Sequence, residues 1–253
     1  MTIFPKSLMG ESGPTTILAY GALLSETSSR LTFPSLTDFR LARVRGMRRV
    51  FAHPHLFLIS QGLADPNHPS LRLASLSAEK LDSTKAEGST LAGFTVAAFE
   101  VDLDDSQREA FVERERDYDI VSVPFYGLSD SADRKEEDEG AAPIGTGVIC
   151  AAGTDDALPA LTANSPANAI LRDLGRSVWH WERDSGLLPA DVYLRHCLLA
   201  VKKAGPEAER SFLDETYLAD RRTSLREYLA IDGNEGRVMA ALPPTSLMTR
   251  YNG

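Results

Sequence analysis

The run Arg114-Glu115-Arg116-Asp117-Tyr118 combines carboxylates, guanidinium groups and a phenol where a helix is expected to give way to a strand. Because apolar segments lie on both sides of this run, the end of that helix is expected to face the core. A carboxylate partly buried there has its pKa raised by desolvation, which suits Glu115 to take up and return protons. Tyr118 suits a pocket wall, since its ring is apolar and its hydroxyl is polar. A solvated, charged helix end is the alternative interpretation.

The loop after the first apolar run is a second candidate binding element. Residues 16–20 (TILAY) are expected to form a strand that ends at Gly21, and Ala22, Leu23 and Leu24 continue the loop. Glycine allows backbone angles that other residues avoid, so successive N–H groups can turn inward and bind a carboxylate. A plain strand-to-loop turn is the alternative, because glycine often only interrupts regular structure.

The segments that must position these residues are β-prone runs separated by turn residues. The run at 91–101 is the clearest strand, and its mostly apolar composition predicts burial on both faces. Ser106 and Glu109 have the spacing of a capping box, which predicts a helix that ends near Arg116. The expected strands of this part are 16–20, 41–52, 56–60, 91–101, 120–125 and 144–152.

From about residue 158 the pattern changes from strands to helical periodicity. Ser165, which precedes a proline, is expected to cap a helix that continues to Gly186. An i, i+3, i+4, i+7 set of apolar residues predicts another helix at 194–205. Ser224 begins a capping box for a later helix. The chain therefore divides into a strand-rich part and a helical part.

Composition and charge narrow the possible partners. The chain has 253 residues, of which 43% are hydrophobic and 25% charged, as in an ordinary globular protein. No apolar run approaches the roughly 18 residues of a membrane helix, so we expect no membrane partner. The net charge of -9 repels phosphate backbones, so no nucleic acid is expected. The arginine cluster at 43–49 is expected to be mainly a solvated strand edge.

The two cysteines, Cys150 and Cys197, form no C-x-x-C pair, which favours a reducing compartment. We expect the cytoplasm, and the sequence leaves a plastid or another organelle open. Both cysteines lie in apolar stretches, which argues against a Cys/His hydrolase because buried thiols are usually inert. Residues 1–14 are expected to be a disordered lead-in. The charged stretch 129–142 is expected to be a mobile surface loop, because it has too few apolar residues to order itself.

Three motifs, taken in chain order, resemble those of the γ-glutamylcyclotransferase-like superfamily. They are the loop Tyr20-Gly21-Ala22-Leu23, the strand segment Gly46-Met47-Arg48-Arg49-Val50-Phe51 and the helix end Arg114-Glu115-Arg116-Asp117-Tyr118. The resemblance implies an α+β fold in which a small mixed β-barrel, residues 15–157, is followed by an α-helical C-terminal extension, 158–253. The extension itself looks like those of plant and algal relatives.

The resemblance also implies a reaction and a set of site residues. In that family a γ-glutamyl group is cyclised to 5-oxoproline and an amine is released, so the implied substrate is a small γ-glutamyl peptide, such as glutathione, or a γ-glutamyl amine. Glu115 is implied as the general acid and base. The loop at 20–24 would hold the α-amino acid end of the γ-glutamyl group, with help from Arg48 or Arg49, and Tyr118 would line the pocket. No metal and no cofactor are expected.

One departure from the family pattern keeps a second function open. Many members have serine after the loop glycine, where this chain has Ala22. The alanine lacks a hydroxyl that would contact the substrate or brace the loop. The alternative is therefore an inactive member of the fold that binds a small ligand, or that binds a protein partner or a second copy of itself through 158–253.

Overall fold

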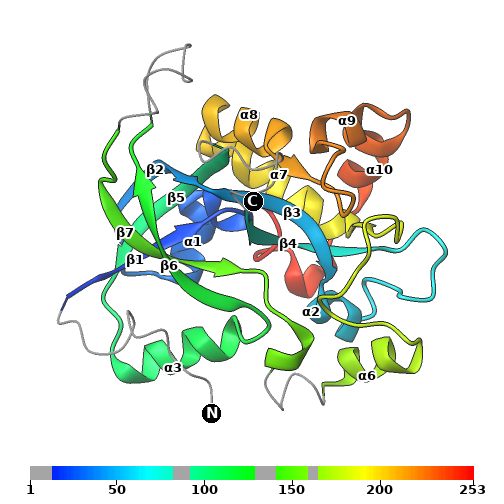
Figure 1. The fold of residues 1–253 in the computed structure, drawn as a ribbon. Helices are drawn as coiled ribbons and strands as arrows, with labels where there is room; N and C mark the ends of the chain where they lie inside the picture. Colours follow the sequence, from blue (N-terminus) through cyan, green and yellow to red (C-terminus); the bar gives the residue numbers. More distant parts are fainter. Residues whose placement is uncertain (1–12, 82–91, 129–140, 159–164) are drawn as a thin grey trace.

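The computed structural model describes residues 13–81, 92–128, 141–158 and 165–253, which form an α+β fold around a closed β-barrel (Figure 1). Within these ranges, strands close the barrel in the order β1-β5-β2-β6-β7, and β7 returns to β1 through a parallel pair at Ile17 and Val148. The predicted fold class, a small mixed barrel followed by an α-helical region, is confirmed. The barrel strands are β1 (Thr15–Ala19), β2 (Thr37–Arg45), β5 (Gly93–Val101), β6 (Asp119–Tyr126) and β7 (Gly145–Ala151).

Strand β5 lies between β1 and β2 and pairs antiparallel with both. Its residues from Phe94 to Phe99 are all buried, as its apolar composition predicts. Gly93 begins the strand where β2 approaches closely, since a Cβ atom there would lie 1.9 Å from the carbonyl oxygen of Val44. Only glycine fits this approach, so the contact between β2 and β5 depends on it.

Outside the barrel, four strands extend the sheet. The antiparallel pair β3 (Met47–Pro54) and β4 (Arg72–Lys80) joins the barrel through a parallel contact between β4 and β7. Two short strands from the helical part add to this pair: β8 (Leu188–Pro189) pairs with β4, and β9 (Thr216–Tyr217) pairs with β3. The helical part thus shares hydrogen bonds with the strand-rich part.

Helices α7 to α10 gather on one side of the sheet, and α3 and α6 lie at its other end (Figure 1). Helix α7 packs on the short 3₁₀ helix η2, and α8 packs on β5. The helices of the described ranges are α1 (Glu26–Thr32), α2 (Leu56–Ser60), α3 (Asp105–Arg114), α6 (Pro166–Asp173), α7 (Asp191–Ala204), α8 (Pro206–Asp214), α9 (Leu225–Ala230) and α10 (Asn234–Ala240). The 3₁₀ helices are η2 (Ala22–Leu24), η4 (Asp155–Ala157) and η5 (Thr245–Leu247).

Two of the strand predictions are corrected by the structure. Residues 56–60 form the helix α2 and not a strand, because four consecutive apolar residues followed by a serine show no period that would distinguish a helix from a strand. The run 41–52 does not form one strand, since it is divided at Gly46, whose φ is +68°. Glycine reaches this left-handed conformation readily, and the chain passes there from β2 into β3.

The helix boundaries are only partly as predicted. Helix α3 is capped by Asp104 and not by Ser106, and Asp104 exchanges hydrogen bonds with Gln107 in a capping box. Both pairs of residues fit the same sequence pattern, so spacing alone does not choose between them. Ser165 does cap α6, but that helix ends at Asp173, earlier than predicted.

Some of the predictions fall on residues that the structure does not describe. The lead-in at 1–14 and the acidic loop at 129–142 lie almost wholly outside the described ranges. Within those ranges, no helix is both long and apolar enough to cross a bilayer.

Candidate functional site

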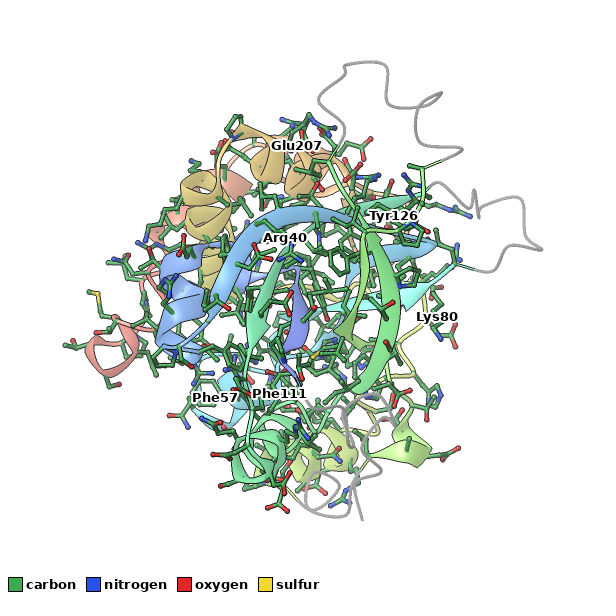
Figure 2. The ribbon with its side chains drawn as sticks, turned by 90° about the vertical axis from the view of Figure 1, so that its left-hand side faces the viewer. Arg40, Phe57, Lys80, Phe111, Tyr126 and Glu207 are labelled. Atoms are coloured by element: carbon green, nitrogen blue, oxygen red, sulfur yellow. The ribbon has the colours of Figure 1, made fainter. Side chains whose placement is uncertain are left out.

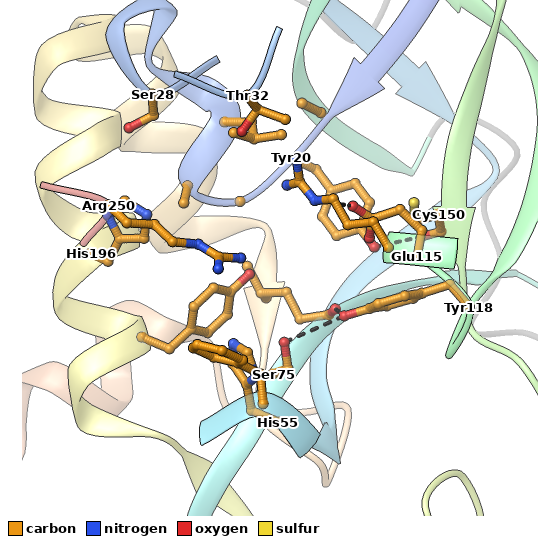
Figure 3. Close-up of a pocket in the computed structure, with 18 of the residues that line it drawn as sticks. Tyr20, Ser28, Thr32, His55, Ser75, Glu115, Tyr118, Cys150, His196 and Arg250 are labelled. Carbon is orange, nitrogen blue, oxygen red and sulfur yellow. Dashed lines mark hydrogen bonds and ion pairs between the residues drawn. The ribbon is translucent and has the colours of Figure 1, made fainter. Parts of the chain in front are cut away.

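A cavity of about 800 Å³ lies where the loop after β1, the end of α3, strand β7, helix α7 and the last residues of the chain meet. Phe57 and Phe111 line it at the end of the barrel away from Tyr126 (Figure 2). Its polar wall comes from segments that are far apart in the sequence, so folding brings these groups together. The polar side chains that line the cavity include those of Tyr20, His55, Glu115, Tyr118, Cys150 and Arg250 (Figure 3).

Glu115 is the residue at which helix α3 ends. Its N–H donates to the carbonyl of Phe111 at 3.0 Å, and the chain then turns toward β6. The carboxylate lines the cavity with only 18% of its side chain exposed, and Nε of Arg114 lies 3.0 Å from its Oε1. Burial raises the pKa of Glu115, while the positive charge of Arg114 and a hydrogen bond with Cys150 oppose that rise. The raised pKa makes this carboxylate a stronger base than an ordinary glutamate.

Tyrosine hydroxyls and a thiol surround the carboxylate in neutral form. The hydroxyl of Tyr20 donates to the carbonyl of Cys150, and that of Tyr118 donates to the carbonyl of Leu76 at 3.0 Å. Burial raises the pKa of both tyrosines well above the usual value. Burial likewise raises the pKa of the Cys150 thiol, and the nearby charge of Glu115 raises it further. Because a thiolate is the reactive form, Cys150 is a poor nucleophile here.

The loop after β1 forms a second wall of the cavity through Tyr20, Gly21, Ala22 and Leu23. A close approach favours glycine at position 21, because a Cβ atom there would lie 2.9 Å from the hydroxyl oxygen of Tyr193. The loop continues as η2, in which the N–H of Leu24 donates to the carbonyl of Gly21 at 3.0 Å.

The remaining predicted binding residues lie away from the cavity lining. The side chain of Leu24 is fully buried in the core. Arg48 donates to the carbonyl of Arg221 at 3.2 Å and does not line the cavity. Arg49 has no exposed surface, which corrects the expectation that the arginine cluster is mainly a solvated edge. The residues brought together are therefore Glu115, Tyr118 and the loop from Tyr20 to Leu23.

Sequence reasoning missed several residues of the cavity. His53 and His55 belong to none of the sequence motifs, yet both line the cavity. Burial lowers the pKa of each histidine to about 3, so both are neutral near pH 7. His53 stacks on Trp179, with 4.3 Å between ring centroids. No spacing rule connects these positions to Glu115, because the contacts join distant segments.

Arg250 and Tyr193 are the other residues that the sequence did not indicate. Tyr193 and His196 line the cavity from α7, and Arg250 enters from the last residues of the chain (Figure 3). The described residues contain no group of three or more His, Cys, Asp or Glu side chains arranged to hold a metal ion.

The chain was compared with known proteins in three ways. Neither the models of protein families nor the curated proteins give a match. Among solved structures, one described as a gamma-glutamyl cyclotransferase is 11% identical with a TM-score of 0.34, and the match covers 54% of this chain and 66% of that one. A gamma-glutamyl cyclotransferase specific to glutathione from yeast is 11% identical with a TM-score of 0.43, and 76% and 88% of the two chains are covered.

In fold, this chain is similar to gamma-glutamyl cyclotransferases. A third similar structure is an uncharacterized human protein, with 14% identity, a TM-score of 0.33 and coverage of 55% of this chain and 68% of that one. The fold class itself rests on the barrel closure between β7 and β1. The cavity offers the carboxylates of Glu115 and Asp117, neutral hydroxyl groups, a glycine loop and the guanidinium of Arg250, and burial raises the pKa of Glu115.

Proposed function

We propose that the chain is an enzyme that cyclises the γ-glutamyl group of a small peptide or amine to 5-oxoproline and releases the amine. One observation carries this proposal: the partly buried carboxylate of Glu115 lines the same cavity as the loop from Tyr20 to Leu23. A proton acceptor and a backbone binding element thus line one cavity. This space of about 800 Å³ suits a small molecule.

Glu115 would begin the reaction by taking a proton from the substrate. An α-amino group has a reference pKa of about 7.7–8.0, so it is largely an ammonium ion near neutrality and cannot attack a carbonyl. Burial raises the pKa of Glu115 and brings it closer to that of the ammonium, which makes the transfer less unfavourable. Because their pKa values are raised well above the usual value, Tyr20 and Tyr118 keep their protons near neutral pH. Of these three side chains, Glu115 is therefore the one that accepts the proton.

For ring closure, the main task of the protein is to hold the amine close to the γ-carbonyl carbon of the same substrate molecule. The freed amine attacks the γ-carbonyl carbon of the same molecule, a new C–N bond closes a five-membered ring, and the bond to the departing nitrogen breaks. The proton held by Glu115 passes to that nitrogen. The ring nitrogen then gives its second proton to the free carboxylate of Glu115, which returns it to the released amine, so the amine leaves as an ammonium ion and the step consumes no water and no oxidant. Holding such a reactive conformer can contribute on the order of 7–11 kcal/mol.

The loop would hold the α-carboxylate of the γ-glutamyl group through its backbone N–H groups. Ala22 stands where many family members have serine, and its side chain has no hydrogen-bond donor. The side chain at this position therefore cannot help to bind the α-carboxylate. Helix α7 packs on η2, which begins at Ala22, and burial raises the pKa of the Cys197 thiol of α7 to about 12. This contact fixes the loop against α7, so the loop is held in place before the substrate enters.

A product assay tests the proposal. Purified protein is incubated with glutathione and with a series of γ-glutamyl amino acids, and products are separated by chromatography and identified by mass spectrometry. We expect 5-oxoproline and the free amine in equal amounts from at least one substrate. Glutamate in place of 5-oxoproline would indicate hydrolysis and contradict the mechanism.

Ala22 favours one alternative, a module of the same fold that binds a γ-glutamyl compound or a protein without turnover. In this case, calorimetry would detect binding of the same compounds while no 5-oxoproline forms. For a protein partner, binding would depend on 158–253 and would survive Glu115→Gln. The product assay and calorimetry on one preparation therefore separate the two functions.

A further inference from the structure

The last residues of the chain are anchored along helix α7 beside the cavity. Tyr251 is 3% exposed, and its ring centroid lies 4.9 Å from that of His196. Lys203 donates to the carbonyl of Asn252 at 2.9 Å, and the N–H of Gly253 donates to Nδ1 of His196 at 3.0 Å. The three residues that follow Arg250 are therefore held against α7, and this fixes the backbone that presents Arg250 to the cavity.

The guanidinium of Arg250 reaches the cavity without pairing with a carboxylate. It lies over the ring of Phe57, with 5.0 Å from its carbon to the ring centroid. Among the residues that the structure describes, no carboxylate forms an ion pair with it. Figure 3 shows its side chain entering the cavity from the side across from Glu115. Its positive charge acts on Glu115, His55 and His196 across this space.

We propose that Arg250 forms an anion subsite that binds a carboxylate on the departing half of the substrate. The inference rests on the proposed function and deepens it, because it makes a γ-glutamyl amino acid or peptide a better substrate than a γ-glutamyl amine without a carboxylate. A guanidinium suits this task, since its planar N–H groups can bind both oxygens of a carboxylate at once.

The positions of Glu115 and Arg250 favour a carboxylate of the departing half, and not the α-carboxylate, as the ligand of Arg250. The side chain of Glu115 is only 18% exposed, whereas Arg250 is an exposed residue at the rim of the cavity. The α-amino group must reach Glu115, and the α-carboxylate is one carbon away from that amine. The rest of the substrate must then extend toward the rim, where Arg250 stands beside Phe57.

A matched pair of ligands tests the subsite. γ-Glutamylalanine and γ-glutamylethylamide differ only in the carboxylate of the departing half. Their dissociation constants are measured by calorimetry on the full chain and on Arg250→Gln, both carrying Glu115→Gln to prevent turnover. Arg172→Gln, in the same background, is the control because it removes an exposed arginine of α6 outside the cavity lining.

We expect γ-glutamylalanine to bind about tenfold more tightly than γ-glutamylethylamide, as for one partly exposed charged contact. Arg250→Gln should remove this preference and leave the affinity for γ-glutamylethylamide unchanged. Arg250→Lys should keep part of the preference for γ-glutamylalanine, and Arg172→Gln should keep all of the preference. A preference that survives Arg250→Gln, or an equal loss for both ligands, overturns the subsite. Binding as expected without formation of 5-oxoproline in the Glu115 protein would overturn the proposed reaction alone, and absence of binding by either ligand would overturn both.

Discussion

Arg49 donates to the backbone carbonyl of Tyr20 at 3.1 Å, so a fully buried guanidinium holds the residue at which the cavity loop begins. The same guanidinium donates to the carbonyl of Ser211 at 2.8 Å and to the hydroxyl of Thr216 at 2.7 Å. Its carbon lies 4.7 Å from the ring centroid of Phe212. Barrel, loop and helical extension thus meet at one side chain.

Replacing Arg49 should therefore destabilise the whole chain. Arg49→Met keeps the apolar stem but leaves the carbonyls of Tyr20 and Ser211 buried without this donor, which should cost about 3 kcal/mol of unfolding free energy. Arg48→Met is the neighbouring control and should cost about 1 kcal/mol or less, because Arg48 is partly exposed. Urea denaturation of both variants gives the comparison. Equal losses would show that Arg49 does not join these parts.

The close approach at Gly21 makes a paired prediction. Gly21→Ala places a methyl group against the hydroxyl of Tyr193, and overpacking of this kind typically costs about 1–3 kcal/mol. Tyr193→Phe removes the oxygen that is in the way, so the double variant should recover part of the loss. Thermal unfolding of the single and double variants measures this coupling. Additive losses would mean that Tyr193 is not what requires glycine here.

The pH dependence of the reaction should follow the ionisation of Glu115. Only the carboxylate accepts a proton, and burial raises its pKa, so kcat/KM should fall on the acid side at a higher pH than for an ordinary glutamate, whose reference pKa is about 4.3. Arg114→Gln removes the charge that most opposes this rise, so it should move the acid limb to higher pH.

Asp117→Asn provides the opposite shift, because the charge of Asp117 raises the pKa of Glu115. Its acid limb should move to lower pH. The measurement is kcat/KM from pH 4 to 9 for the wild-type chain and both variants. An acid limb that stays in place in both variants would assign it to another group.

The parts of the fold that depend on local pattern were predictable from the sequence. Strand β5 follows from its continuous β-prone run, and the start of α6 follows from Ser165 before a proline. Where a sequence pattern fits two local structures equally well, the sequence does not decide which of the two forms. Residues 56–59 are all apolar and show no period, and both Ser106 and Asp104 have the spacing of a capping box.

The cavity was predictable only in part, for a related physical reason. Glu115 and the loop at Gly21 carry local motifs, and both line the cavity. His55, Tyr193 and Arg250 carry no such motif. They come from the turn between β3 and α2, from α7 and from the last residues of the chain, which only folding brings together. The burial of Arg49 could not be predicted from the sequence either. Its guanidinium donates to the backbone carbonyls of Ser211 and Tyr20, which lie far from Arg49 in the sequence.

The most direct measurement compares Glu115→Gln with Glu113→Gln in the 5-oxoproline assay. Both changes remove a carboxylate at the end of α3, but the side chain of Glu113 is 56% exposed and pairs with Arg116. Glu115→Gln should reduce the rate of 5-oxoproline formation by about 100-fold or more while the protein stays folded, and Glu113→Gln should retain the wild-type rate. Equal rates in the two variants would contradict the assignment of Glu115 as the base.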